Sequence, residues 1–265
     1  MNDLKEDNSH WWWALGIAAV TAAGIGWYLW RQQASPPPAP QVAAPAPAPA
    51  PAPPPEPVIE YPVAPPPTAP ALPALADSDA VAQQALAGLL GSKVVQELFN
   101  VDGLIRRIVV TVDNLPREKL AMRQSPLKPV GGNFGVLQTG DAVLIGADNA
   151  RRYAAHVKLV SAIDAKQVAS LYRQFYPLFQ RAYEELGYPK AYFNDRAIAV
   201  IDHLLATPDA PALVKLVQPK VLYEFADPDL QSRSAGQKML LRMGNDNAAT
   251  VKAKLRELRV ELARK

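Results

Sequence analysis

Apolar residues in the second half of the chain recur at intervals of three and four positions, a spacing that predicts amphipathic helices. The clearest of these helices follows Asp164, and its apolar stripe runs from Val168 to Leu186. Pro177 lies inside the stripe, and because proline removes a backbone donor we expect a kink or a break there. Further helices are expected over residues 148–160, 192–206 and 234–243, and from Asn247 to the end of the chain.

Two earlier segments show the same periodicity. Ser78 can cap a helix interrupted at Gly91-Ser92, and Asp102 can start another, whose β-branched residues would also suit a strand. Strand signals are few: VLQTGDAVLIG is typical of a short hairpin about Gly140-Asp141, and LVKLVQPKVLYEF could form an extended edge interrupted by Pro219. The pattern therefore predicts a mainly α fold, a helical globular domain with a small β element.

The beginning of the chain has a different character. Residues 11–30 are 20 uncharged positions, enough for a helix to cross a hydrocarbon layer of about 30 Å. Aromatic residues lie at both ends of this run: Trp11, Trp12, Trp13, Trp27, Tyr28 and Trp30. Such aromatic belts are typical of a transmembrane anchor, whereas a cleaved signal peptide has a shorter apolar run and a recognisable cleavage site. We therefore expect residues 11–30 to contact the lipid bilayer as a single span.

Only ten residues precede the span, so we expect the short end in the cytoplasm and the large C-terminal part in the periplasm of a bacterium, at the inner membrane. Lys5 and Arg31 lie on opposite sides and leave the positive-inside bias nearly balanced. Small residues recur every four positions within the span: Ala14, Ala18, Ala22 and Gly26. This row could be the seam of a transmembrane homodimer, although any alanine-rich span contains such a row.

Composition divides the rest of the chain. Of the 27 prolines, 18 fall between Pro36 and Pro73, where proline and alanine alternate. Proline fixes φ and lacks a donor, so this tract is expected to be disordered or extended polyproline II and to act as a spacer; its PxxP spacing also leaves open a role as a ligand. The predicted organisation is a tail and anchor at 1–35, a Pro/Ala-rich tether at 36–76 and a helical domain at 77–265.

Two long runs in the domain carry a family resemblance. YPLFQRAYEELGYPKAYFNDRAIAVIDHLLATPDAP and LVQPKVLYEFADPDLQSRSAGQKMLLRMG resemble a bacterial domain of unknown function, family 3014. The resemblance covers most of 77–265. It implies a membrane-anchored bacterial protein without an assigned activity, and it supplies no catalytic residues.

The run YEELGYPKAYFNDR, residues 183–196, holds four aromatic residues in 14 positions. Gly187 and Pro189 interrupt the helical pattern there and place part of the run in a connection, where binding residues are common. Tyrosine offers a large contact area with a polar end, so this run is a candidate recognition surface; the alternative is that its rings fill the core. The binding candidates are Tyr183, Tyr188, Tyr192 and Asp195.

Residues 77–265 hold 26 Lys and Arg against 20 Asp and Glu, a net charge of +6. The last helix has a cluster of cations that could meet anionic lipid or an acidic partner, or could simply be a solvated face near the helix C-terminus: Lys252, Lys254, Arg256 and Arg259. Because no recognisable nucleic-acid-binding fold accompanies these cations, we expect no nucleic acid partner.

Motifs for catalysis are scarce. The chain has no cysteine, and its three histidines lack metal-ligand spacing, so neither a metal nor another cofactor is expected. The one enzymatic alternative is a tethered enzyme that cleaves cell-wall glycan with paired carboxylates, for which Asp195 and Asp202 could share a helix face. Helix caps and solvated carboxylates explain the same residues. The favoured hypothesis is a non-enzymatic interaction module that binds an envelope protein or a cell-wall partner.

Overall fold

The computed structural model describes residues 27–31, 58–64 and 71–264 of a chain that forms two compact units, 1–54 and 55–265. In the first unit, residues 27–31 form a helical turn in which Arg31 lies over the ring of Trp27, 5.2 Å from its centroid. No helix within the described ranges has both the length and the apolar character needed to cross a membrane. Most of the predicted span 11–30 lies outside those ranges.

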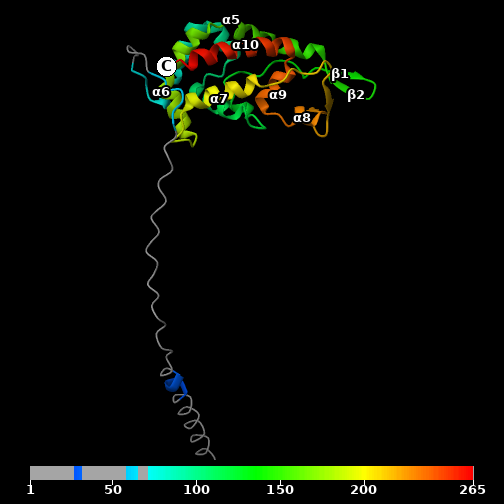
Figure 1. Ribbon diagram of the computed structural model, residues 1–265. Helices are drawn as coiled ribbons and strands as arrows, with labels where there is room; N and C mark the ends of the chain where they lie inside the picture. Colours follow the sequence, from blue (N-terminus) through cyan, green and yellow to red (C-terminus); the bar gives the residue numbers. More distant parts are fainter. Residues whose placement is uncertain (1–26, 32–57, 65–70, 265) are drawn as a thin grey trace, which may run out of the picture. The chain divides into compact units, whose positions relative to one another are not determined.

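The second unit is mainly helical, with a small antiparallel sheet at one end (Figure 1). This agrees with the fold class expected from the apolar spacing. The α-helices are α2 (Asp79–Leu90), α3 (Ser92–Leu98), α4 (Leu104–Asn114), α5 (Ala154–Ala162), α6 (Ala165–Glu185), α7 (Phe193–Leu205), α8 (Pro228–Gln231), α9 (Ala235–Arg242) and α10 (Asn245–Leu262). Short 3-10 helices are η1 (Leu75–Asp77), η2 (Met122–Gln124) and η3 (Ala147–Tyr153).

Helix α6 is the long central element and packs against α4, α7 and α10. Asp164 caps it by accepting the backbone N–H groups of Lys166 and Gln167, as its position before the apolar stripe suggests. The helix continues through Pro177, so the expected break is absent. Buried side chains on both sides of the proline hold the two halves against one core: Phe175, Tyr176, Leu178 and Phe179.

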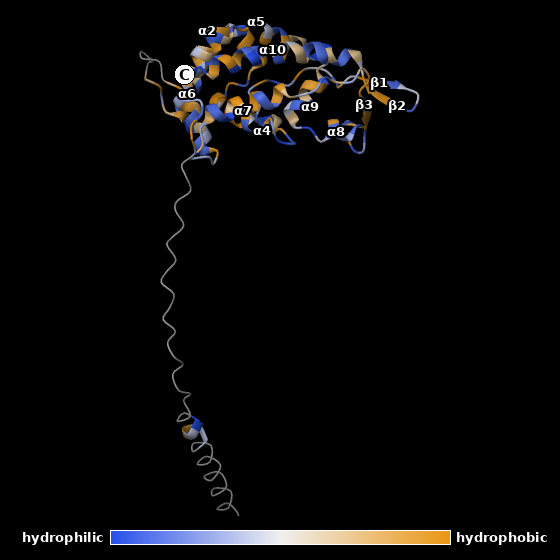
Figure 2. Cartoon of the chain, viewed as in Figure 1, coloured by the Kyte–Doolittle hydropathy of each residue, from blue (hydrophilic) through white to orange (hydrophobic). Residues whose placement is uncertain are grey.

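The largest core cluster joins α4, α6 and the start of α7 and is rich in aromatic rings. Phe193, 1 % exposed, packs against Phe179 with 5.9 Å between ring centroids, and Val109 is fully buried. A second cluster lies between α7, α9 and α10, and a third lies under the sheet. Figure 2 shows both hydrophobic and hydrophilic residues on the helices of this unit.

The sheet contains β1 (Val136–Thr139), β2 (Ala142–Ile145), β3 (Lys215–Val217) and β4 (Glu224–Phe225), in that spatial order, all antiparallel. The first hairpin is confirmed, with Gly140 at a positive φ of 56° in its turn. The run around Pro219 is two short paired strands instead of one extended edge, because the chain reverses between Val217 and Glu224.

Helix starts depend on contacts that lie far apart in sequence. Ser78 does not cap α2; its hydroxyl donates to the carbonyl of Leu75. The start of α4 is capped from outside: the Asp79 carboxylate accepts the N–H groups of Gly103 at 2.7 Å and Leu104 at 3.2 Å. Asp79 of α2 thus caps the start of α4 by accepting N–H groups that have no partner within that helix.

Candidate peptide-binding site

Three of the four binding candidates lie around the start of α7, and one is core. Tyr183 is 4 % exposed and stacks on Tyr188 with 4.6 Å between centroids, so its ring supports the fold instead of a free surface. Tyr188 and Tyr192 are half-buried, and both rings pack against the main core cluster. Asp195 lies in the first turn of α7, where a carboxylate is favoured by the helix dipole.

Residues 58–64, with the sequence VIEYPVA, are held against this part of α7; we call them the strap. The Asp195 carboxylate accepts the backbone N–H of Glu60 at 3.1 Å and that of Tyr61 at 2.9 Å. The Tyr192 hydroxyl oxygen accepts the N–H of Val63 at 2.7 Å. The strap lies N-terminal to the boundary expected at residue 76, so part of the proline-rich segment belongs to the folded unit.

Asn194 provides the remaining hydrogen bond to the backbone of the strap. Its side-chain amide donates to the Tyr61 carbonyl at 2.9 Å and to the Leu262 carbonyl at 3.1 Å, and therefore joins the strap to the end of α10 (Figure 1, cyan and red segments). We refer to Tyr192, Asn194 and Asp195 as the α7 clamp. Pro62 has no N–H, so the clamp binds every backbone donor of residues 60–63.

Side chains of the strap alternate between the domain and solvent. Tyr61 and Val63 are half-buried, whereas Glu60, Pro62 and Ala64 are exposed. Val63 packs against the aromatic core cluster. This alternation is typical of an extended segment, in which successive side chains point to opposite sides.

The clamp is supported by buried tyrosines. Tyr172 donates its hydroxyl to Oδ1 of Asn194 at 3.1 Å, and Asn194 donates its backbone N–H to the Tyr176 oxygen at 3.3 Å. Asn194 itself is fully buried. Burial raises the pKa of both tyrosines well above the usual value, so both phenols stay protonated at neutral pH.

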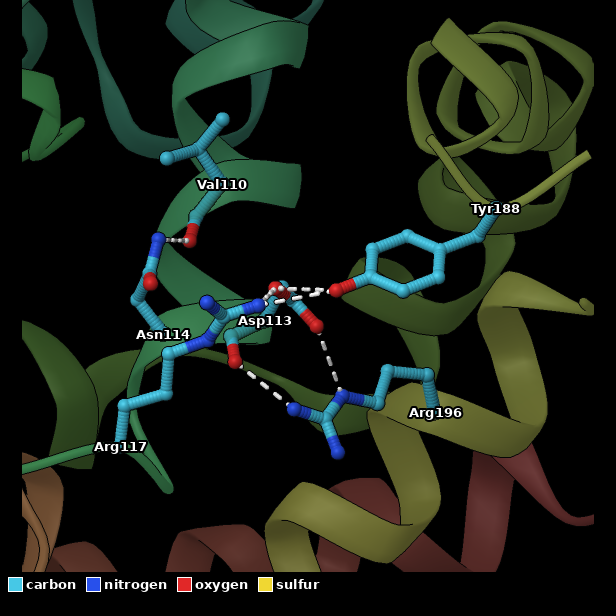
Figure 3. A network of polar contacts seen from close by, with 6 residues as sticks. All are labelled: Val110, Asp113, Asn114, Arg117, Tyr188 and Arg196. Atoms are coloured by element: carbon cyan, nitrogen blue, oxygen red, sulfur yellow. Dashed lines mark hydrogen bonds and ion pairs between the residues drawn. The ribbon is translucent and has the colours of Figure 1, made fainter. Parts of the chain in front are cut away.

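A buried carboxylate fixes the position of α7 behind the clamp. Asp113, at the end of α4, is 2 % exposed. It accepts Nε of Arg196 at 3.1 Å and a nitrogen of Arg117 at 2.5 Å, and its backbone carbonyl accepts a second nitrogen of Arg196 at 2.8 Å. The Tyr188 hydroxyl lies 3.4 Å from the same carboxylate, so four side chains converge on one point (Figure 3).

The network ties α4, α7 and the connection before α7 into one rigid support. The Asp113 carboxylate raises the pKa of Arg117 through their hydrogen bond and charge attraction. Because Arg196 follows Asp195 directly in the chain, holding its guanidinium also fixes the turn that presents the clamp.

The four cationic candidates of α10 do not form one free surface. Lys252 is 7 % exposed and donates to the Thr207 carbonyl, and Lys254 pairs with Glu257. Arg259 pairs with Asp202 through two hydrogen bonds, whereas Arg256 is exposed. The Asp202 carboxylate raises the pKa of Arg259 through their hydrogen bonds and charge attraction.

The carboxylates that an enzyme would need are engaged in other contacts. Asp195 binds backbone amides and Asp202 binds Arg259. Glu185, a further carboxylate near Asp195 in sequence, has its pKa lowered by Arg106 and less strongly by Arg181, the opposite of what a general acid requires. In the ranges that the structure covers, no group of three or more His, Asp or Glu side chains could hold a metal ion.

Tyr192 and Asp195 were named as candidates from the sequence, whereas Asn194 and the strap were not. The aromatic density of 183–196 pointed to the right segment. Asn194 gives no signal of its own, since a single asparagine in a helix start is usually a local cap. Tyr61 and Val63 could have indicated that the strap contacts the domain, because they are large side chains in a tract made mostly of proline and alanine.

Residues 104–259 match the sequence model of a family described as "Protein of unknown function (DUF3014)", which confirms the resemblance seen in the sequence. The match covers more than half of the chain, and the chain belongs to this family. The clamp lies inside the matched range and the strap lies before it. No curated protein and no solved structure matches the chain.

Proposed function

We propose that the chain is a single-pass bacterial envelope protein that works as a non-enzymatic interaction module. Residues 11–30 anchor it in the inner membrane, and the Pro/Ala-rich tract carries the domain away from the bilayer on the periplasmic side. The domain then contacts an envelope protein or the cell wall. Uncharged residues with aromatic belts support the anchor, and the proline content supports an extended spacer.

One observation carries the interaction role: the α7 clamp binds an extended peptide segment through the backbone of that segment. Three N–H groups and one carbonyl of residues 60–63 are bound by side chains about 130 positions away. Main-chain recognition of an extended segment is a recurring way in which domains bind peptides. The two carboxylates considered for hydrolysis, Asp195 and Asp202, are both engaged in other contacts.

The alternative is the tethered glycan-cleaving enzyme. An enzyme of that class needs two carboxyl groups facing one another across a cleft, with one pKa raised. Asp195 and Asp202 have hydrogen-bonding partners that compete with this role. Purified full-length protein should therefore bind cell-wall sacculi saturably or leave them untouched, and should release no soluble fragment. Release of fragments would favour the enzyme.

Cross-linking in living cells tests the interaction itself. Ala199 is exposed on α7, one turn beyond Asp195, and Ala253 is an exposed control on α10. A photo-reactive residue at 199 should form an adduct with an envelope component, and the same residue at 253 should not. Equal labelling at both positions would contradict a specific site on α7.

Membrane attachment and sidedness need separate tests. The protein should stay in the membrane pellet through alkaline carbonate washing. Protease added to spheroplasts should cleave the tract before residue 58. Cleavage only after lysis would place the domain in the cytoplasm and contradict the proposed topology.

A further inference from the structure

The strap occupies the α7 clamp as a ligand occupies a receptor, and its contacts define what else could bind there. The clamp offers acceptors to three N–H groups and a donor to one carbonyl, all of them in the backbone of residues 60–63. These bonds fix the direction and register of the bound segment. They do not depend on its side chains, so a peptide from another protein could make them equally well.

Selectivity comes from the side chains of the strap. Tyr61 and Val63 are both half-buried, and Val63 packs against the aromatic core cluster. Between them, Pro62 is exposed, and it has no N–H that the clamp would need to bind. Proline is suited to this position because it has no N–H, and its fixed φ lowers the cost of ordering the peptide. The preferred order is therefore tyrosine, proline, aliphatic.

The receptor side is rigid without help from the strap. Oδ1 of Asn194 is fixed by Tyr172, and one of its amide hydrogens is fixed by the carbonyl of Leu262. The Tyr192 ring lies against Tyr176, with 5.3 Å between centroids. A site whose side chains are already held loses little freedom when a peptide binds.

We propose that the α7 clamp is a receptor for an extended peptide of the order tyrosine, proline, aliphatic, and that residues 60–63 are its resident ligand. A partner segment of the same chemistry binds by displacing the strap. This inference rests on the proposed interaction role and names the partner class. The strap masks the site until such a segment is present.

The strap is covalently linked to the domain, and the length of this link determines how strongly the strap competes with a free peptide. Only residues 65–70 separate the strap from the part of the domain that follows. A ligand on a short connection acts at an effective concentration of about 1 mM. A free peptide that binds the open site with a Kd of about 10–100 μM would then bind the masked site at least tenfold more weakly.

The test uses the full-length protein in detergent and a fluorescent peptide of residues 58–64. In the double variant Tyr61→Ala/Val63→Ala the strap is weakened while the clamp is intact. We expect the peptide to bind this variant with an apparent Kd at least tenfold lower than it has for the wild type. Adding Asp195→Ala should abolish binding, whereas adding Asp246→Ala, a first-turn acid of α10, should leave it unchanged. A peptide with alanine in place of proline at position 62 should bind more weakly.

A folded double variant that binds the peptide no better than wild type would overturn the proposal. If the double variant fails to fold, amide exchange of the wild type decides: excess peptide should accelerate exchange at Glu60, Tyr61 and Val63, and unchanged exchange would overturn the proposal. A dimer that exchanges straps between two copies would also contradict it, by replacing the partner peptide with a second chain.

The two proposals fail in different ways. Loss of peptide binding with the Ala199 cross-link intact would remove the peptide receptor and leave the interaction module. Release of soluble fragments from sacculi would remove the non-enzymatic role, whatever the peptide does.

Discussion

Tyr61 donates its backbone N–H to Oδ1 of Asp195 at 2.9 Å, although 134 positions separate the two residues. The bond brings a segment of the proline-rich tract onto the first turn of α7. Asp195 is favoured there by the helix dipole, and it accepts two backbone N–H groups of the strap. The Asp195 carboxylate therefore stabilises the first turn of α7 and also binds the strap.

The strap and the residues after it should add to the stability of the domain. Leu75 is 8 % exposed, and Leu72 packs against the same cluster as Val63. Burying one such side chain contributes about 1.5–3 kcal/mol. A chain of residues 58–265 should therefore melt at a higher temperature than one of residues 77–265, with 71–265 between them. Equal melting temperatures by circular dichroism would show that the folded unit begins at residue 77.

Asp113→Asn should weaken the support behind the clamp. The substitution takes the buried carboxylate away from the partly exposed guanidinium of Arg196, and losing a hydrogen bond to a charged group costs about 1.5–3 kcal/mol. Glu97→Gln is the matched control, because its pair with Lys93 is exposed on both sides, and the substitution should change stability by less than about 1 kcal/mol. Chemical denaturation measures both; similar losses would contradict the structural role of Asp113.

Gly236→Ala should destabilise the start of α9. An added Cβ would lie 2.6 Å from Cδ2 of Leu204 and 3.0 Å from the backbone oxygen of Leu115, so the packing must shift. Overpacking of this kind costs about 1–3 kcal/mol. At Gly88, inside α2, nothing lies within 4 Å of the added Cβ, and alanine there should stabilise the helix by up to about 1 kcal/mol. Thermal melting should move in opposite directions for the two variants.

The protein should lose stability in alkali. Burial raises the pKa of Tyr172, Tyr176 and Tyr183 above the usual value. A group with a raised folded-state pKa contributes stability that is complete below its unfolded pKa, about 10 for tyrosine, and that is lost as the pH rises further. The melting temperature should therefore fall above about pH 10. Ionisation of these rings in the folded protein near pH 10, seen in the ultraviolet spectrum, would contradict their burial.

The apolar spacing was enough to predict most helices. The stripe after Asp164 became α6, and the helix expected from Asn247 became α10. Amphipathic periodicity is local information, and it survives in the fold because each stripe is buried against the others. We predicted a kink or a break at Pro177; there is no break, because packing on both sides outweighs one lost hydrogen bond.

The site was predicted in part. Tyr192 and Asp195 were chosen for their residue types and their place in a connection, but the strap depends on contacts across about 130 positions that no local pattern encodes. The contacts of the α10 cations could not be predicted either, since a sequence does not show that Lys252 bonds to the Thr207 carbonyl or that Arg259 pairs with Asp202. Both the strap contacts and the partners of the α10 cations depend on polar pairs between residues far apart in sequence.

Amide hydrogen exchange in the full-length protein tests most directly whether the α7 clamp holds residues 60–63. The N–H groups of Glu60, Tyr61 and Val63 should exchange more slowly than that of Ala64, for which no acceptor is found among the described residues. Asp195→Ala should restore fast exchange at Glu60 and Tyr61, while Asp246→Ala should not. Exchange at the rate of an unstructured peptide at all of these amides in the wild type would contradict the account.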